Sequence, residues 1–220
     1  SESSMMVPLG CGYIKAYVEK ELGGEVDVKI FKHPERALAA ALNENPDIIG
    51  FANYVWNRQL NLKIGQYLKQ KLPNTLFVAG GPNIDVDETG QKAFLKRYNF
   101  LDFVITNSGE EPFCELINWQ RNEHKDYDKL PENLVWLENE VVRKTPERKI
   151  TKKVQGIPSP YLNGQLDEFL AMGMIPLFET NRGCPFACTF CAWGMSAQNL
   201  VRQFDIGSVF EEIEYVAERS

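Results

Sequence analysis

The sequence predicts an α/β protein, with a Rossmann-like (flavodoxin-like) parallel sheet in its first half and one β-α unit at its end. Three observations support this class. Short apolar runs alternate with amphipathic helical segments as far as residue 122. Glycine- or asparagine-containing turns follow three of these runs, and three cysteines crowd into residues 184–191. Because strands that alternate with helices are joined by right-handed crossovers, the first half should contain a buried parallel sheet.

The first half divides into strands and helices of ordinary length. Pro34 suits the first turn of a helix, and residues 58–72 space their apolar side chains by three and four. No strand precedes the loop and helix at the start, so we expect the strand that normally opens such a domain to be missing. The predicted strands are 26–31, 47–55, 75–81 and 101–109, and the predicted helices are 7–22, 34–45, 58–72, 88–98 and 111–122.

The pattern changes after residue 122. Residues 133–145 form two alternating segments around "ENE", which predicts a β-hairpin without a turn glycine. Residues 156–170 contain two prolines and two glycines and indicate a linker. A strand at 175–181 and a helix at 205–220 then flank the cysteines. We therefore expect a Rossmann-like domain over 1–122, a hairpin and linker over 123–170, and the start of a second domain over 171–220.

Composition excludes several functional classes. The 220 residues carry a net charge of −6 and no dense basic run, which argues against a nucleic-acid partner. No apolar stretch approaches the roughly 20 residues that a membrane span needs. Five cysteines, three of them close together, suit metal ligation in a reducing cytoplasm better than a secreted disulfide scaffold.

The cysteine spacing is the most informative pattern. Cys184, Cys188 and Cys191 follow CxxxCxxC, whereas a structural zinc site normally needs four ligands and a disulfide needs two. Three thiolates can hold three irons of a four-iron cluster and leave one iron open for chemistry. The alternative is a zinc site completed by a distant histidine, from His33 or His124. Two further cysteines, Cys11 and Cys114, lie in apolar helical segments and are predicted to be buried small hydrophobic residues.

These motifs also carry a family resemblance. The cysteine spacing, with Phe190 directly before the last cysteine, resembles that of the radical S-adenosylmethionine (radical SAM) enzymes. Upstream, "PLGCGYIKAYVE", "AGGPN", "NSGEEPF" and "PSPYLNG" precede it in the order found in cobalamin-binding-domain radical SAM proteins. The chain is similar to this family over essentially its whole length.

The resemblance implies cofactors and chemistry. It implies a 4Fe-4S cluster on Cys184, Cys188 and Cys191, cleavage of S-adenosylmethionine to a 5′-deoxyadenosyl radical, and methyl transfer or rearrangement at an unactivated carbon. A small-molecule or natural-product substrate and a reductant such as flavodoxin or ferredoxin are implied as partners. Cobalamin is implied near the strand-end residues Asn53, Gly80, Gly81, Pro82, Ser108 and Gly109, and Phe190 beside the cluster cofactors.

Two departures from the pattern qualify these implications. The DxHxxG motif of many cobalamin proteins is absent, and His33 is either a surface residue before Pro34 or a candidate cobalt ligand. One β-α unit is also far short of a β/α barrel of about 200 residues. We therefore expect an inactive fragment of a longer enzyme. Two alternatives remain: a radical enzyme whose Rossmann-like half is a scaffold, and a non-catalytic module that binds zinc or an iron–sulfur cluster.

Overall fold

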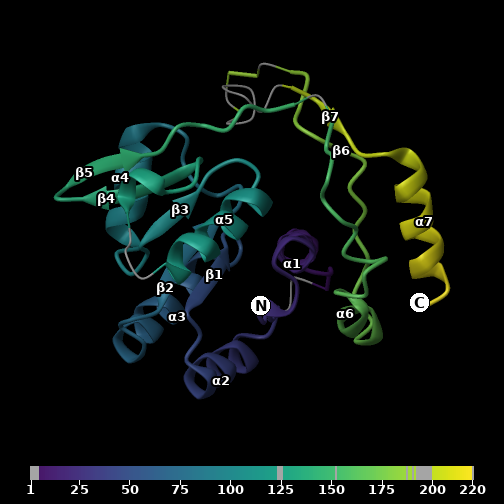
Figure 1. Ribbon diagram of the computed structural model, residues 1–220, viewed down its shortest axis with the longest axis horizontal. Coiled ribbons are helices and arrows are strands. Elements are labelled where there is room, and N and C mark those ends of the chain that lie inside the picture. The colour runs from purple at the N-terminus through teal and green to yellow at the C-terminus, as the bar shows by residue number, and fades with distance from the viewer. Residues whose placement is uncertain are drawn as a thin grey trace. The chain divides into compact units, whose positions relative to one another are not determined.

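The computed structural model describes residues 5–122, 126–151, 153–186, 188–189, 191 and 200–219 (Figure 1). The chain forms two compact units. Phe31–Arg148 form one of them, called here the sheet unit. Ser1–Ile30 and Lys149–Ser220 together form the other, called here the cysteine unit. The domain borders expected after residues 122 and 170 stay a prediction.

The sheet unit contains the predicted parallel sheet. Strands β1 (Ile48–Ala52), β2 (Leu76–Gly80) and β3 (Phe103–Ile105) lie side by side in sequence order and run parallel. Helices α3 (Arg58–Lys71) and α4 (Glu88–Arg97) connect them, as Figure 1 shows. The predicted α/β class is therefore confirmed, although β3 is shorter than the run at 101–109.

Each face of this sheet has its own core, because successive strand residues point to opposite faces. Phe77 and Ala79 pack with residues of α2 (Pro34–Glu44), α3 and α4 on one face. On the other face, Leu76 and Val78 pack against Leu116 and Trp119 of α5 (Glu110–Arg121). The parallel strands are thus covered on both faces, as their continuous apolar sequences predict.

The predicted hairpin is confirmed and extends the same sheet. Strand β4 (Leu134–Glu138) pairs antiparallel with β3 and with β5 (Val141–Lys144), after the short 3₁₀ helix η2 (Tyr127–Lys129). Asn139 and Glu140 form the two-residue turn with φ of 48° and 66°. Positive φ at both positions is the geometry of the type I′ turn that matches the twist of a hairpin, and asparagine tolerates it better than most residues.

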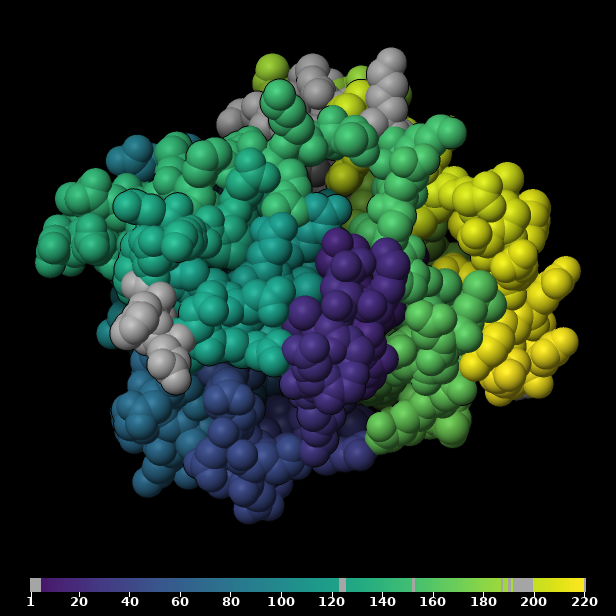
Figure 2. Space-filling view, in the orientation of Figure 1, coloured from purple at the N-terminus to yellow at the C-terminus, as the bar shows by residue number. Residues whose placement is uncertain are grey.

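The cysteine unit is built around helix α1 (Leu9–Leu22), followed by the 3₁₀ helix η1 (Gly23–Glu25). Gly12 lets α1 approach the segment 156–170 closely, because a Cβ atom there would lie 2.9 Å from Pro160 Cβ. Figure 2 shows α1 in purple next to green residues of the same unit. The core of the unit also includes residues of α6 (Asp167–Ala171) and α7 (Ile206–Ala217); its buried members are Val7, Tyr161, Leu166, Phe169, Leu170 and Val216.

Two strand predictions are wrong. Residues 26–31 form no strand, although Val26 has extended backbone angles, and the Val28 carbonyl accepts a hydrogen bond from Lys15 instead. In 175–181, Ile175 makes a single bridge to Met6 and Asn181 alone reaches strand β6 (Asn181–Arg182). An apolar, β-branched sequence becomes a strand where a neighbouring backbone supplies hydrogen bonds, and these segments lack such a neighbour for most of their length in the described structure.

The helix predictions agree with the structure to within two residues at most boundaries. Helices α1 to α5 and α7 all lie where apolar spacing predicts them. None of the described helices combines the length and the apolar character needed to cross a lipid bilayer.

Candidate functional site

The predicted cobalamin-binding residues lie at one edge of the sheet unit. Asn53 directly follows β1, and Gly80 ends β2. Ser108 and Gly109 follow β3, and Gly109 is the N-cap residue of α5. Because β1, β2 and β3 are parallel, their carboxyl ends meet at the same edge, where α/β proteins bind ligands. The structure thus brings the three predicted turns to one edge, and their ligand contacts stay a prediction.

Asn53 joins the turns that follow β1 and β2. Its backbone N–H donates to the Gly80 carbonyl at 2.7 Å, and its side-chain Nδ2 donates to the Asn83 carbonyl at 3.1 Å. In return, the Asn83 N–H donates to the Asn53 carbonyl at 3.3 Å. The side chain is buried, and its Oδ1 has no hydrogen-bond partner among the described residues. Asn53 therefore holds the turns after β1 and β2 together, while its Oδ1 remains available to accept a hydrogen bond.

Gly81 has to be glycine in this arrangement. Its φ is +110°, a conformation that L side chains rarely adopt. A Cβ atom on Gly81 would also lie 2.8 Å from the Asn53 carbonyl oxygen. Gly80 is different, because the nearest atom to its Cβ position is the Ile105 oxygen at 3.8 Å. The glycine pair thus combines a turn at Gly81 that a side chain would strain with a position at Gly80 where a Cβ atom would make an ordinary van der Waals contact.

Sequence reasoning missed an aromatic pair at the same edge. Tyr54 and Trp56 stack with ring centroids 4.6 Å apart and an interplanar angle of 12°. Asn57 shapes this turn, since its Oδ1 accepts from the Tyr54 N–H and its Nδ2 donates to the Ala52 carbonyl. Trp56 is 57% exposed, which is unusual for so large an apolar side chain. The aromatic run "NYVW" directly after an apolar strand was the signal that could have found it.

The three clustered cysteines lie on a loop of the cysteine unit. This loop begins at β6 and ends at β7 (Arg202–Gln203), which pair antiparallel. All three thiols are free; Cys188 is exposed, while Cys184 and Cys191 are half-buried. In the part of the chain that the structure describes, no three cysteine, histidine or acidic side chains gather closely enough to hold a metal ion. Phe190 lies outside the described residues, as does His124.

The remaining cysteines and His33 differ in how far they are buried. Cys114 is buried in α5, as expected for a small hydrophobic residue, while Cys11 on α1 is half-buried. His33 is exposed at the N-cap position of α2 and makes no side-chain capping bond there. Its exposure agrees with the prediction of a surface residue before Pro34.

Helix α7 of the cysteine unit carries a buried carboxyl group. Glu212 is 5% exposed, and its Oε2 has no hydrogen-bond partner among the described residues. Burial raises the pKa of the Glu212 carboxyl, a hydrogen bond from Ser159 opposes this rise, and the charge of Glu179 adds to it. Tyr161 lies close enough for the Glu212 charge to add to the burial that raises the pKa of its hydroxyl to about 12.

The Glu212 carboxyl should make stability depend on pH. Because its pKa is higher in the folded chain, the stability it contributes is fully present below the unfolded pKa and is lost as pH rises through the folded pKa. Glu212→Gln should therefore raise the free energy of unfolding at pH 8 by about 1 kcal/mol and give no gain at pH 4. Urea unfolding at both pH values checks this. Glu214→Gln, at an exposed position of α7, is the control, and an equal gain from Glu212→Gln at both pH values would contradict the assignment.

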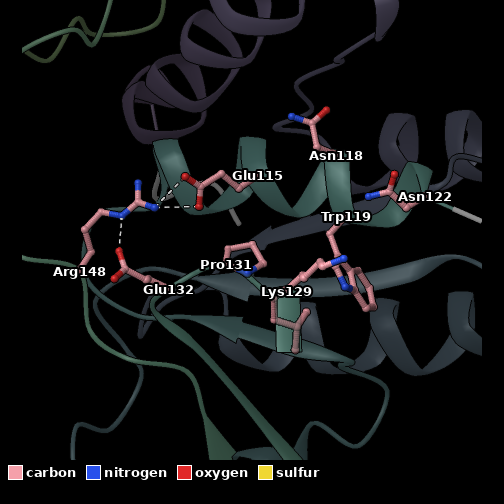
Figure 3. A pocket seen from close by; sticks show the side chains of 9 residues that line it. Glu115, Asn118, Trp119, Asn122, Lys129, Pro131, Glu132 and Arg148 are labelled. Atoms are coloured by element: carbon pink, nitrogen blue, oxygen red, sulfur yellow. Dashed lines mark hydrogen bonds and ion pairs between the residues drawn. The ribbon is translucent and has the colours of Figure 1, made fainter. Parts of the chain in front are cut away.

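A surface pocket of about 400 Å³ lies along α5 in the sheet unit (Figure 3). At one end, Arg148 donates to Glu132 at 3.0 Å and to both oxygens of Glu115 at 2.7 and 2.8 Å, and it also pairs with Glu111. The guanidinium is therefore already satisfied by three carboxylates. None of the residues lining this pocket is among the predicted site residues.

Comparison with known proteins finds a matching family and relatives that agree with the family resemblance of the sequence. The B12 binding domain family matches residues 3–117. The 2-(S-pantetheinyl)-carbapenam-3-carboxylate methyltransferase of Streptantibioticus cattleyicolor is 32% identical over 222 aligned positions, which cover 96% of this chain and 32% of that protein. The cobalamin-dependent radical SAM methyltransferase TokK of Streptomyces tokunonensis gives the same identity and coverage. The chain thus spans about a third of the length of these relatives.

A solved structure has the same fold. It is that of the cobalamin-dependent S-adenosylmethionine radical enzyme OxsB with aqua-cobalamin and S-adenosylmethionine bound. It matches with a TM-score of 0.76 at 19% sequence identity, over 99% of this chain and 30% of that one. At this identity the likeness concerns the fold alone.

Proposed function

Since the family match covers residues 3–117, this chain belongs to the B12 binding domain family, and we propose that it forms the cobalamin-binding and cluster-binding part of a radical SAM methyltransferase. Its relatives include cobalamin-dependent radical SAM methyltransferases. One observation at the carboxyl edge of the parallel sheet carries the proposal. There Asn53 joins the turns after β1 and β2 by hydrogen bonds, and Gly81 lies too close to the Asn53 carbonyl to carry a side chain.

The residues at this edge fit a flat macrocycle. Gly80 has no side chain to keep a ligand away from the end of β2, and Gly81 brings exposed backbone to the edge. The corrin ring carries side-chain amides, which need hydrogen-bond donors and acceptors. The Asn53 Oδ1 is an acceptor without a partner among the described residues, directly beside these glycines. Pro82, Ser108 and Gly109 complete the set of small or rigid residues to which we assign cobalamin contacts.

Trp56 adds an apolar wall to the proposed site. Its stacking on Tyr54 and the hydrogen bonds of Asn57 limit its movement, so its indole can offer a flat surface at the sheet edge. His33 receives no role, and the proposal needs no histidine on cobalt.

Cys184, Cys188 and Cys191 are assigned to the cluster. The fit rests on the donor set, because all three are free thiols on one loop and thiolates are the ligands of iron–sulfur clusters. The loop would have to close around the metal, as many metal sites do on binding. When bound, a four-iron cluster with one iron free of protein ligands supplies the electron that cleaves S-adenosylmethionine, and cobalamin carries the methyl group. The chain's own residues hold these groups in place.

The proposal for the whole protein includes its partners. We assign it a small-molecule or natural-product methyl acceptor and a protein reductant such as flavodoxin or ferredoxin. We assign the substrate pocket to the whole protein and not to this chain, because the chain spans about a third of the length of its relatives.

Titration with hydroxocobalamin tests the first half of the proposal. The 220-residue chain should change the visible spectrum of hydroxocobalamin in a saturable way. Binding would replace the water around the corrin ring with residues of the sheet edge, which changes the environment of the chromophore. Equilibrium dialysis measures the stoichiometry, which should approach one corrinoid per chain. An unchanged spectrum with no retained corrinoid would leave the sheet unit as a scaffold.

A further inference from the structure

The cysteine loop is closed at its base by a very short ladder. Strands β6 and β7 pair only Asn181 with Gln203 and Arg182 with Arg202. The Phe204 N–H donates to the Thr180 carbonyl at 3.1 Å and extends it. On the other side of β7, Lys153 makes a single parallel bridge to Gln203, whose carbonyl accepts from the Val154 N–H at 3.1 Å. A two-stranded ribbon of this length is not stable by itself. Backbone bonds at the base of the loop are thus few, and side-chain contacts add to them.

Arg182 makes several contacts at this base. Its guanidinium carbon lies 5.1 Å from the centroid of the Tyr13 ring and 5.2 Å from that of Phe204. The two rings stack on each other, with centroids 5.6 Å apart. The Arg182 Nε also donates to Glu179 Oε2 at 2.9 Å, and its side chain is only 13% exposed. Cation–π contacts and ion pairs gain strength when they are shielded from water in this way.

These contacts connect the loop to helix α1 of the cysteine unit. Tyr13 is 2% exposed on α1, one residue after Gly12, which packs against Pro160 and Leu166. Phe204 directly follows β7. Arg182 thus fixes β6 to α1 on one side and to the residue after β7 on the other, two residues before Cys184.

The contacts of Arg182 with Glu179, Tyr13 and Phe204, called here the clamp, also offset a repulsion within the ladder. Arg182 and Arg202 face each other across the ladder, and like charges directly opposite on paired strands repel. Glu179 and the two ring faces offset the charge of Arg182.

We propose that Arg182 is a positioning residue for the cysteine loop: it anchors the backbone two residues before Cys184 to α1 and to Phe204, and so fixes where this thiol is presented to a cluster. The proposal rests on the cluster assignment made above. Arginine is suited to this task because its planar guanidinium can lie on aromatic rings while its N–H groups bind a carboxylate.

Three variants separate the contributions of charge and stacking. Arg182→Met keeps the length of the side chain and removes its charge, Arg182→Lys keeps the charge without the planar group, and Phe204→Leu removes one ring. Arg143→Met is the matched control, because Arg143 makes an exposed ion pair with Glu138 on the β4–β5 hairpin. Val216→Ala is a second control, which destabilises the core of the cysteine unit without touching the clamp.

Hydrogen exchange of the apo chain is the first measurement. Arg182→Met should speed exchange of the Phe204 amide about tenfold or more, with smaller effects for Arg182→Lys and Phe204→Leu. Arg143→Met should match the wild type, and Val216→Ala should lower the melting temperature without selectively exposing this amide. Equal exchange in Arg182→Met and the wild type would overturn the proposal, whether or not the chain takes up iron.

Cluster retention is the second measurement. After anaerobic reconstitution, Arg182→Met should lose iron to a chelator several times faster than the wild type, with Arg182→Lys between them. If the wild type retains iron and sulfide and Arg182→Met retains them equally long, the clamp has no role in the metal site and the inference fails alone. If the wild type takes up neither, the cluster assignment fails, and the exchange result still decides whether Arg182 anchors the loop.

Discussion

Replacing Cys184, Cys188 and Cys191 together by serine should reduce the iron and sulfide taken up in anaerobic reconstitution from about four of each per chain to background. The hydroxyl of serine is a poor ligand for iron in such clusters, and among the described residues no group of three cysteine, histidine or acidic side chains lies close enough together to replace the thiols. Elemental analysis and the visible absorption of the cluster measure the result. Each single substitution should also lower uptake, because three ligands are the minimum that the assignment allows.

The two remaining cysteines provide the control. Cys114→Ala removes a thiol buried in α5, and Cys11→Ala removes a half-buried thiol on α1. Both variants should take up iron and sulfide like the wild type. One equivalent of zinc without sulfide, in protein reconstituted with both iron and sulfide, would instead support a zinc module.

Gly80→Trp should weaken hydroxocobalamin binding by about 100-fold or more, which corresponds to roughly 2.7 kcal/mol. The indole would occupy the space at the sheet edge that the flat ring needs. Gly80 is the better probe of the glycine pair, because its Cβ position has no atom nearer than 3.8 Å. At Gly81 any side chain would meet the Asn53 carbonyl at 2.8 Å, so a substitution there would disturb the loop as well as the ligand.

A graded series makes this test specific. Gly80→Ala should bind almost as well as the wild type, Gly80→Val less well and Gly80→Trp hardly at all. Gly24→Trp is the matched control, since Gly24 is an exposed glycine of the cysteine unit with no atom within 4 Å of its Cβ position. If the wild type and a folded Gly80→Trp variant bind hydroxocobalamin with equal affinity, cobalamin does not bind at this edge of the sheet.

Much of the fold followed from local patterns. Apolar spacing located helices such as Arg58–Lys71, and short apolar runs located Leu76–Gly80, because these features are properties of consecutive residues. The α/β class followed from their alternation. The failures were segments at 26–31 and 175–181, whose composition favours strands. Local sequence cannot report whether a partner backbone lies alongside, and that decides whether such a segment joins a sheet.

In the candidate sites, too, some features followed from local sequence and others only from the tertiary structure. By itself the sequence determined the thiol set, since the spacing of Cys184, Cys188 and Cys191 is readable in one dimension, and it identified Asn53 and the glycine pair as strand-end residues. Only the tertiary structure decided that the Asn53 carbonyl requires glycine at position 81. It alone also brought Arg182 onto Tyr13, which lies 169 positions earlier in the chain. Contacts between residues so distant in sequence depend on how whole elements pack, which no short-range pattern encodes.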